Sequence, residues 1–116
     1  FVLFAIQQSV NFMTRIVILA SGSGSNAENI IKYFNNNNLI SVDHILCNKK
    51  GAKVFERAKR LKISSLYFDK EMLNESDFVL NFLKDKADYI ILAGFLWKIP
   101  SKIIEAFPNK IINIVF

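Results

Sequence analysis

The residues with the clearest chemical potential lie in the stretch Ser21–Asn26, which reads SGSGSN. A β-branched apolar run precedes it, and a segment with helical spacing of apolar residues follows it directly. Gly22 and Gly24 leave the backbone open to a ligand, and the amides of residues 24–26 would lie at the positive end of the helix. The side chains of residues 25 and 26 would add donors or cap that helix. The pattern predicts a phosphate-binding loop at Gly24, Ser25 and Asn26 rather than a plain strand-to-helix turn.

The same stretch also satisfies the Gly-x-Gly-x-x-Ala spacing of dinucleotide-binding loops, through Gly22, Gly24 and Ala27. Such a site expects an acidic residue at the end of the second strand, where it binds a ribose hydroxyl. Here that strand is followed by Lys49–Lys50, while Asp43 lies at its start. The pattern therefore disfavours NAD, whereas a 2′-phosphate on the two lysines leaves NADP open.

A second informative stretch is Tyr89–Pro100, YIILAGFLWKIP. A strand is expected to end at Ala93, and Gly94 allows a sharp turn. The residues that follow, Phe95–Trp97, stay apolar where a loop is usually polar. Two interpretations remain open: a pocket for a flat, partly aromatic ligand, or a cover over the end of the sheet.

The last eight residues, NKIINIVF, place an almost unbroken apolar run after a Pro-Asn-Lys turn. This run predicts a strand buried on both faces. Domains seldom end inside such an element, because termini normally lie at the surface. A terminus at residue 116 is therefore unexpected.

Strand and helix patterns alternate along the chain and would position these loops. Strands are predicted at 15–20, 42–48, 65–68, 89–93 and 110–116. Helices are predicted at 26–34, 52–61, 75–86 and 100–107, the first ended by left-handed asparagines within 35–38. Alternation with doubly buried strands predicts a Rossmann-like α/β fold, an open and mostly parallel sheet of about five strands. Loops that follow the strands then gather at one edge, where ligands bind.

Composition bounds the possible functions. The 116 residues form at most one domain, and the net charge of +5 comes from lysines spread along the chain, which indicates a solvated surface rather than a nucleic-acid site. A single cysteine, Cys47, excludes an intrachain disulfide and suits a reducing cytoplasm. No stretch is long enough to span a membrane, and no residue cluster has metal-ligand spacing. The lone His44, early in its strand, is interpreted as structural.

Residues 1–12 do not fit the alternating pattern. They carry no charge and no Met, and Met13 comes immediately before the first strand. They lack the basic region and cleavage site of a secretory signal. We expect Met13 to be the natural start and residues 1–12 to be an extension, with an extra helix packed on the domain of residues 13–116 as the alternative.

Taken together, these motifs resemble the glycinamide ribonucleotide formyltransferase family of purine biosynthesis. The segments RIVILASGSGSN, CNKKGAKVFERAKRLKI, DYIILAGFLWKIP and FPNKIINIVF resemble its opening strand and phosphate loop, its second loop and helix, its folate-side loop and its catalytic strand. The resemblance implies transfer of a formyl group from 10-formyltetrahydrofolate, as co-substrate, to the amine of glycinamide ribonucleotide. No metal, nucleic acid or membrane is implied.

The resemblance also implies roles for individual residues. The ribonucleotide phosphate would bind at Gly24, Ser25 and Asn26, and folate would bind along Leu96, Trp97, Lys98 and Ile99, with Asn113 nearby.

The family's chemistry needs an Asn-x-His pair at the end of the fifth strand and a later Asp. Asn113 matches the Asn, but Val115 stands in the His position. The resemblance implies that the chain is truncated after the fifth strand, so that the family's second half is missing, including the Asp. We therefore expect an enzyme family but an inactive chain. The alternative is a non-catalytic module that binds a nucleotide phosphate or NADP.

Overall fold

The computed structural model describes residues 13–114, which form one five-stranded sheet in the order β3-β2-β1-β4-β5. Every neighbouring pair of strands is parallel. The strands are β1 (Thr14–Ala20), β2 (Ile40–Cys47), β3 (Ser64–Tyr67), β4 (Tyr89–Ala93) and β5 (Ile111–Ile114). The predicted Rossmann-like, parallel α/β architecture is confirmed.

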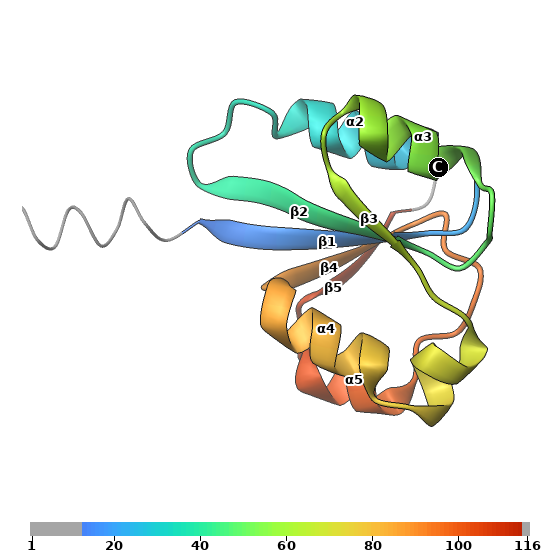
Figure 1. Ribbon diagram of the computed structural model, residues 1–116. Coiled ribbons are helices and arrows are strands. Elements are labelled where there is room, and N and C mark those ends of the chain that lie inside the picture. Colours follow the sequence, from blue (N-terminus) through green and yellow to red (C-terminus); the bar gives the residue numbers. More distant parts are fainter. Residues whose placement is uncertain (1–12, 115–116) are drawn as a thin grey trace, which may run out of the picture.

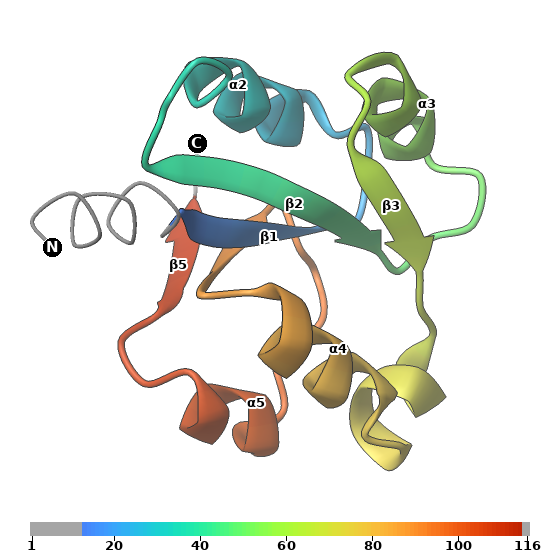
Figure 2. The same cartoon turned by 60° about the vertical axis from the view of Figure 1, so that its left-hand side comes forward.

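Helices cover both faces of this sheet (Figure 1). The helices are α2 (Ser25–Tyr33), α3 (Lys53–Arg60), α4 (Phe78–Lys86) and α5 (Ser101–Ala106), with a π-helical turn η1 (Glu71–Glu75) before α4. Helices α2 and α3 lie on one face, and α4 and α5 lie on the other, as the turned view in Figure 2 also shows.

The central strand β1 divides the core into two layers. Its side chains alternate: Ile16 and Ile18 pack with α2 and α3, whereas Val17 and Leu19 pack with α4 and α5. All four are almost completely buried. Continuous apolar sequence is therefore what a strand covered on both faces requires.

The expectation for β5 was wrong in one respect. Ile111 packs with the α4/α5 layer, but Ile112 is 47% exposed and Asn113 is also exposed. β5 pairs with β4 at the edge of the sheet, and no described helix covers it on the α2 side. The apolar run is therefore buried on one face rather than on two.

The asparagine run ends α2 by a mechanism other than the expected one. None of residues 35–38 has positive φ, so the left-handed prediction was wrong. Instead, the Oδ1 atom of Asn37 accepts hydrogen bonds from the backbone N–H groups of Leu39 and Ile40, at 2.7 and 3.0 Å. The side chain thus turns the chain directly into β2.

Two expectations lie outside the described residues: the extension or extra helix at residues 1–12, and Val115 with Phe116. Between residues 13 and 114, none of the helices has the length and apolar character needed to cross a bilayer.

Candidate functional site

The strand order creates a point where the chain reverses direction across the sheet. From β1 the chain proceeds outward to β2 and β3, and it then returns to β4 on the other side of β1. Loops that leave β1 and β4 at their carboxyl ends therefore diverge from each other, which is where parallel sheets bind ligands. The two stretches singled out in the sequence are these two loops.

The loop after β1 is shaped by Gly24, which has φ +82° and occupies the N-cap position of α2. The alternative that Ser25 or Asn26 caps the helix is therefore wrong, because Ser25 is already the first helical residue. The N–H of Glu28 donates to the carbonyl oxygen of Gly24 at 2.8 Å and closes the first turn. The amides of residues 25–27 thus have no partner within the helix.

A small hollow of about 90 Å³ lies between the two loops. It is lined by residues from both of them: Gly22, Ser23, Gly24, Ser25, Asn26, Ala93 and Gly94. The three predicted phosphate-binding residues therefore border one hollow at the N-terminus of α2. Backbone amides and the helix dipole favour an anion at such a place.

Ser21 links the two loops and was missed by the sequence reasoning. Its side chain is buried, and its Oγ atom accepts a hydrogen bond from the backbone N–H of Leu96 at 3.0 Å. The bond joins residues 75 positions apart. A serine beside a glycine-rich loop carries no sequence signal for such a distant partner.

Three aromatic side chains form a cluster beneath the loop after β4. Phe68 is fully buried, and its ring centroid lies 5.9 Å from that of Phe95 and 6.1 Å from that of Trp97. The ammonium group of Lys70 lies 5.3 Å from the Trp97 centroid. Trp97 therefore does help to cover the end of the sheet.

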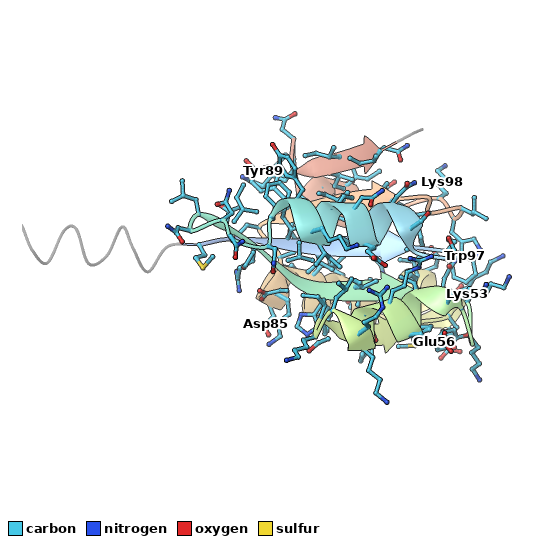
Figure 3. All side chains as sticks on the ribbon, turned by 90° about the horizontal axis from the view of Figure 1, so that it is seen from above. Lys53, Glu56, Asp85, Tyr89, Trp97 and Lys98 are labelled. Carbon is cyan, nitrogen blue, oxygen red and sulfur yellow. The ribbon has the colours of Figure 1, made fainter. Side chains whose placement is uncertain are left out.

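The outer side of Trp97 borders a larger hollow of about 540 Å³. Its lining comes from the loop after β4 and from the η1 region: Lys70, Asn74, Leu96, Trp97, Lys98, Pro100 and Ser101. Figure 3 shows Trp97 and Lys98 at the same end of the molecule, opposite Tyr89 and Asp85. Covering the sheet and lining a hollow are thus compatible roles for one tryptophan.

The four predicted folate-side residues do not share one environment. Leu96, which is 82% exposed, lines the larger hollow together with Trp97 and Lys98. Ile99 is 8% exposed and packs in the α4/α5 layer of the core. Its side chain supports the loop from beneath.

Asn113 lies near the carboxyl end of β5, in register with Leu92 of β4. The next residue, Ile114, is in register with Ala93, which lines the small hollow. Asn113 is therefore at the same edge of the sheet as the two loops, one strand beyond β4. Val115 lies outside the described residues.

Charged groups near the predicted phosphate loop form a compact cluster on α2 and α3. The Glu28 carboxylate is 9% exposed and contacts Lys32, Arg57 and Arg60 at 2.9, 2.7 and 2.6 Å. Hydrogen bonds from Arg60, Lys32 and Arg57 lower the pKa of Glu28 to about 2. Glu28 is thus a permanent anion paired with three cations, not a proton donor at neutral pH.

Other candidate groups are accounted for by their surroundings. Burial raises the pKa of the Cys47 thiol, and Lys50 lies over the Tyr67 ring at 5.5 Å. His44 packs edge-on against Phe82 and lies in the α4 layer. Among the residues that the structure describes, no three His, Cys, Asp or Glu side chains gather as a metal site would require.

Comparisons with known proteins agree with this geometry. A family model described as formyl transferase matches residues 14–115. Phosphoribosylglycinamide formyltransferase from Bacillus subtilis is 33% identical over 108 residues, which are 88% of this chain and 55% of that protein. The chloroplastic phosphoribosylglycinamide formyltransferase of Arabidopsis thaliana is 31% identical, over 86% of this chain and 37% of that protein.

Solved structures of proteins with these names also resemble this chain. Glycinamide ribonucleotide transformylase 1 from Geobacillus kaustophilus superposes with a TM-score of 0.79 at 31% identity, covering 87% of this chain and 57% of that one. Phosphoribosylglycinamide formyltransferase from Bacillus halodurans gives a TM-score of 0.75 at 32% identity, covering 86% and 55%. The chain spans about half the length of most of these relatives.

Proposed function

The chain belongs to the formyl transferase family, and on that premise we propose that it supplies the phosphate loop and the folate-side loop of a phosphoribosylglycinamide formyltransferase. The reaction transfers a formyl group from 10-formyltetrahydrofolate to the amine of glycinamide ribonucleotide. The names of the similar proteins, phosphoribosylglycinamide formyltransferase and glycinamide ribonucleotide transformylase, support this choice of substrate. The free Cys47 thiol suits the cytoplasmic location that forms part of the proposal.

One observation carries the proposal: the hollow between the loops after β1 and β4, bordered by the first residues of α2. In our proposal the ribonucleotide phosphate accepts hydrogen bonds from the backbone amides of Gly24, Ser25 and Asn26. Their small or polar side chains leave room for three phosphate oxygens. No side-chain cation is required, because the helix N-terminus supplies positive potential.

The folate co-substrate is assigned to the loop after β4. Leu96 and Trp97 offer apolar surface at the larger hollow, and Lys98 offers positive charge. Ile99 holds the loop onto the core. A flat, conjugated ring with an anionic tail suits this combination of apolar surface and charge.

The chemical step explains why we propose that this chain is inactive by itself. Attack of the substrate amine on the formyl carbon yields a tetrahedral intermediate whose oxyanion needs hydrogen-bond donors. Asn113 offers one donor, but Val115, in the position assigned to His by the resemblance, can neither donate a hydrogen bond nor carry a proton. Loss of one such donor typically lowers the rate about a hundredfold or more.

Calorimetric titration tests the binding half of the proposal. Glycinamide ribonucleotide should bind to the 116-residue chain, and the riboside without its phosphate should bind at least about tenfold more weakly. Asn26→Ala removes the side-chain amide donor that Asn26 adds to its backbone N–H, and it should weaken binding of the ribonucleotide, whereas Asn29→Ala, one turn further along α2, should not. Micromolar binding of NADP with none of the ribonucleotide would overturn the proposal in favour of a dinucleotide module.

A formyl-transfer assay with both substrates tests the catalytic half. The chain should show turnover at least about a hundredfold below that of the Bacillus subtilis relative assayed in parallel. Turnover within tenfold of that relative would show that the Asn-x-His pair is dispensable.

A further inference from the structure

Helix α3 holds the phosphate loop from the side opposite the hollow, and one of its side chains bonds to the loop directly. We propose that Arg57 is a positioning residue, which fixes the direction of the Gly24 amide by binding the carbonyl group of Ser23. The inference rests on the proposed phosphate site and adds a residue to it that does not touch the ligand.

The bond itself is short and charge-assisted. The Nε atom of Arg57 donates to the carbonyl oxygen of Ser23 at 2.8 Å. This oxygen belongs to the same peptide unit as the N–H of Gly24. In a trans peptide the C=O and N–H groups point in opposite directions, and no described peptide bond is cis. Holding the carbonyl toward α3 therefore turns the Gly24 N–H away from α3.

The sheet order shows where this amide then points. Helix α3 connects β2 to β3, on one side of β1, whereas the hollow is completed by Ala93 and Gly94 after β4, on the other side. Away from α3 is thus toward the hollow. The guanidinium of Arg57 acts on the anion site through the peptide unit that separates them.

Glu28 keeps Arg57 in this orientation. Its Oε1 atom accepts a hydrogen bond from Nη1 of Arg57 at 2.7 Å, so a single guanidinium spans the loop and the first turn of α2. Gly24, which has φ +82°, lies between Ser23 and Glu28 in the sequence, so the two hydrogen bonds flank it. The planar guanidinium makes both bonds at once, which a lysine ammonium on a flexible stem does less well.

Val54 supplies a second, independent contact between α3 and the loop. It is fully buried, and a Cβ atom placed on Gly24 would lie 2.9 Å from the Cα atom of Val54. The loop therefore has no space to move toward α3. Packing prevents collapse in that direction, and the Arg57 bond prevents rotation of the peptide.

Arg60 provides a matched control. Its Nη2 atom contacts the same Glu28 oxygen at 2.6 Å, and its hydrogen bond goes to that carboxylate rather than to the loop. Replacing Arg57 or Arg60 by Gln removes one cation from the same carboxylate. Only the change at Arg57 frees the Ser23 carbonyl.

The test compares Arg57→Gln, Arg57→Lys and Arg60→Gln in the full chain, titrated with inorganic phosphate and with glycinamide ribonucleotide. Arg57→Gln should weaken both about tenfold, Arg57→Lys less, and Arg60→Gln less than about threefold. Amide NMR should show a shifted, faster-exchanging Gly24 N–H in Arg57→Gln only. Urea unfolding should show that both Gln variants stay folded, with a larger stability loss for Arg57→Gln, which loses the Ser23 bond as well as one Glu28 contact.

The outcomes separate the inference from the proposed function. If the wild-type chain binds ligand and the two Gln variants bind equally well, the inference is wrong and the proposed function stands. If the wild-type chain binds neither ligand, the proposed function fails. The Gly24 amide then decides the inference alone, and an unchanged resonance in Arg57→Gln overturns it.

Discussion

The two halves of the α2 side of the sheet differ in how they are covered. Over β1, β2 and β3, helices α2 and α3 bury Ile18 and Ile45 completely. Over β5, no described helix is present, and an apolar hollow of about 370 Å³ remains beside α2. It is lined by Asn29, Ile30, Tyr33, Phe34, Ile91, Ile112 and Ile114.

This difference shows what an apolar strand pattern does and does not specify. Both β2 and β5 carry isoleucines on this face. Helices cover Ile45 of β2, whereas Ile112 and Ile114 of β5 line an open hollow. Apolar alternation predicts which side chains seek burial, but not whether another element is present to bury them.

The largest test of the comparison is the same substitution in each half. Ile45→Ala in β2 should lower the free energy of unfolding by about 2–5 kcal/mol, because it leaves a cavity in a closed layer. Ile112→Ala in β5 should cost less than about 1 kcal/mol, since that side chain is already 47% exposed. Urea unfolding measures both. Equal losses would mean that the open half is covered in solution.

A second test concerns the tight contact of the closed half. Gly24→Ala introduces a side chain at φ +82° and against the backbone of Val54. Gly51→Ala is the control, because it has φ +71° but open space around it. We expect the control to lose about 1–2 kcal/mol of stability from backbone strain, and Gly24→Ala to lose more than that together with phosphate binding. Similar losses in stability would mean that α3 moves away at little cost.

A third test addresses the bond that joins the two halves. Ser21→Ala removes the acceptor for the Leu96 amide and should cost about 1–2 kcal/mol. Ser23→Ala, at an exposed side chain of the same loop, should stay within about 0.5 kcal/mol. Thermal or urea unfolding distinguishes them. A neutral Ser21→Ala would show that the two loops are held together by packing alone.

A fourth test concerns the acid dependence of the closed half. Glu28 has a pKa near 2 in the folded chain against an ordinary value of 4.5, so folding favours its charged form. Its contribution is therefore complete above pH 4.5 and is lost as the pH falls toward 2. The stability gap between wild type and Glu28→Gln should narrow in that window. If the difference in unfolding free energy between the two proteins stays constant from pH 4.5 to 2, the three cations do not stabilise the Glu28 carboxylate.

Much of the fold could be predicted from the sequence because its signals are local. The run before Ser21 and the bounds of β4 follow directly from apolar patterning. The turn η1 could not, because Glu71–Glu75 has no periodic pattern and depends on the fully buried Leu73. The position of the predicted phosphate loop also had a local signal, in glycines placed between a strand and a helix.

The contacts that fix the site could not be predicted in the same way. Arg57 reaches back 34 residues to Ser23, and Leu96 reaches back 75 to Ser21. Neither pair has a local signature, since arginine on a helix and serine in a loop are ordinary residues. Those pairings depend on the strand order, which sequence periodicity leaves undetermined.

The Ser21–Leu96 bond has a consequence for the order of folding. β1 and β2 pair once residues 21–39 have formed their connection, whereas β4 docks on β1 only after the longer segment 21–88 has closed. Contacts of such sequence separation form slowly. The walls of the small hollow therefore meet late, and under our proposal a ligand that touches both walls binds only chains that have completed that step. Ligand binding should accordingly slow unfolding by opposing the separation of β4 from β1.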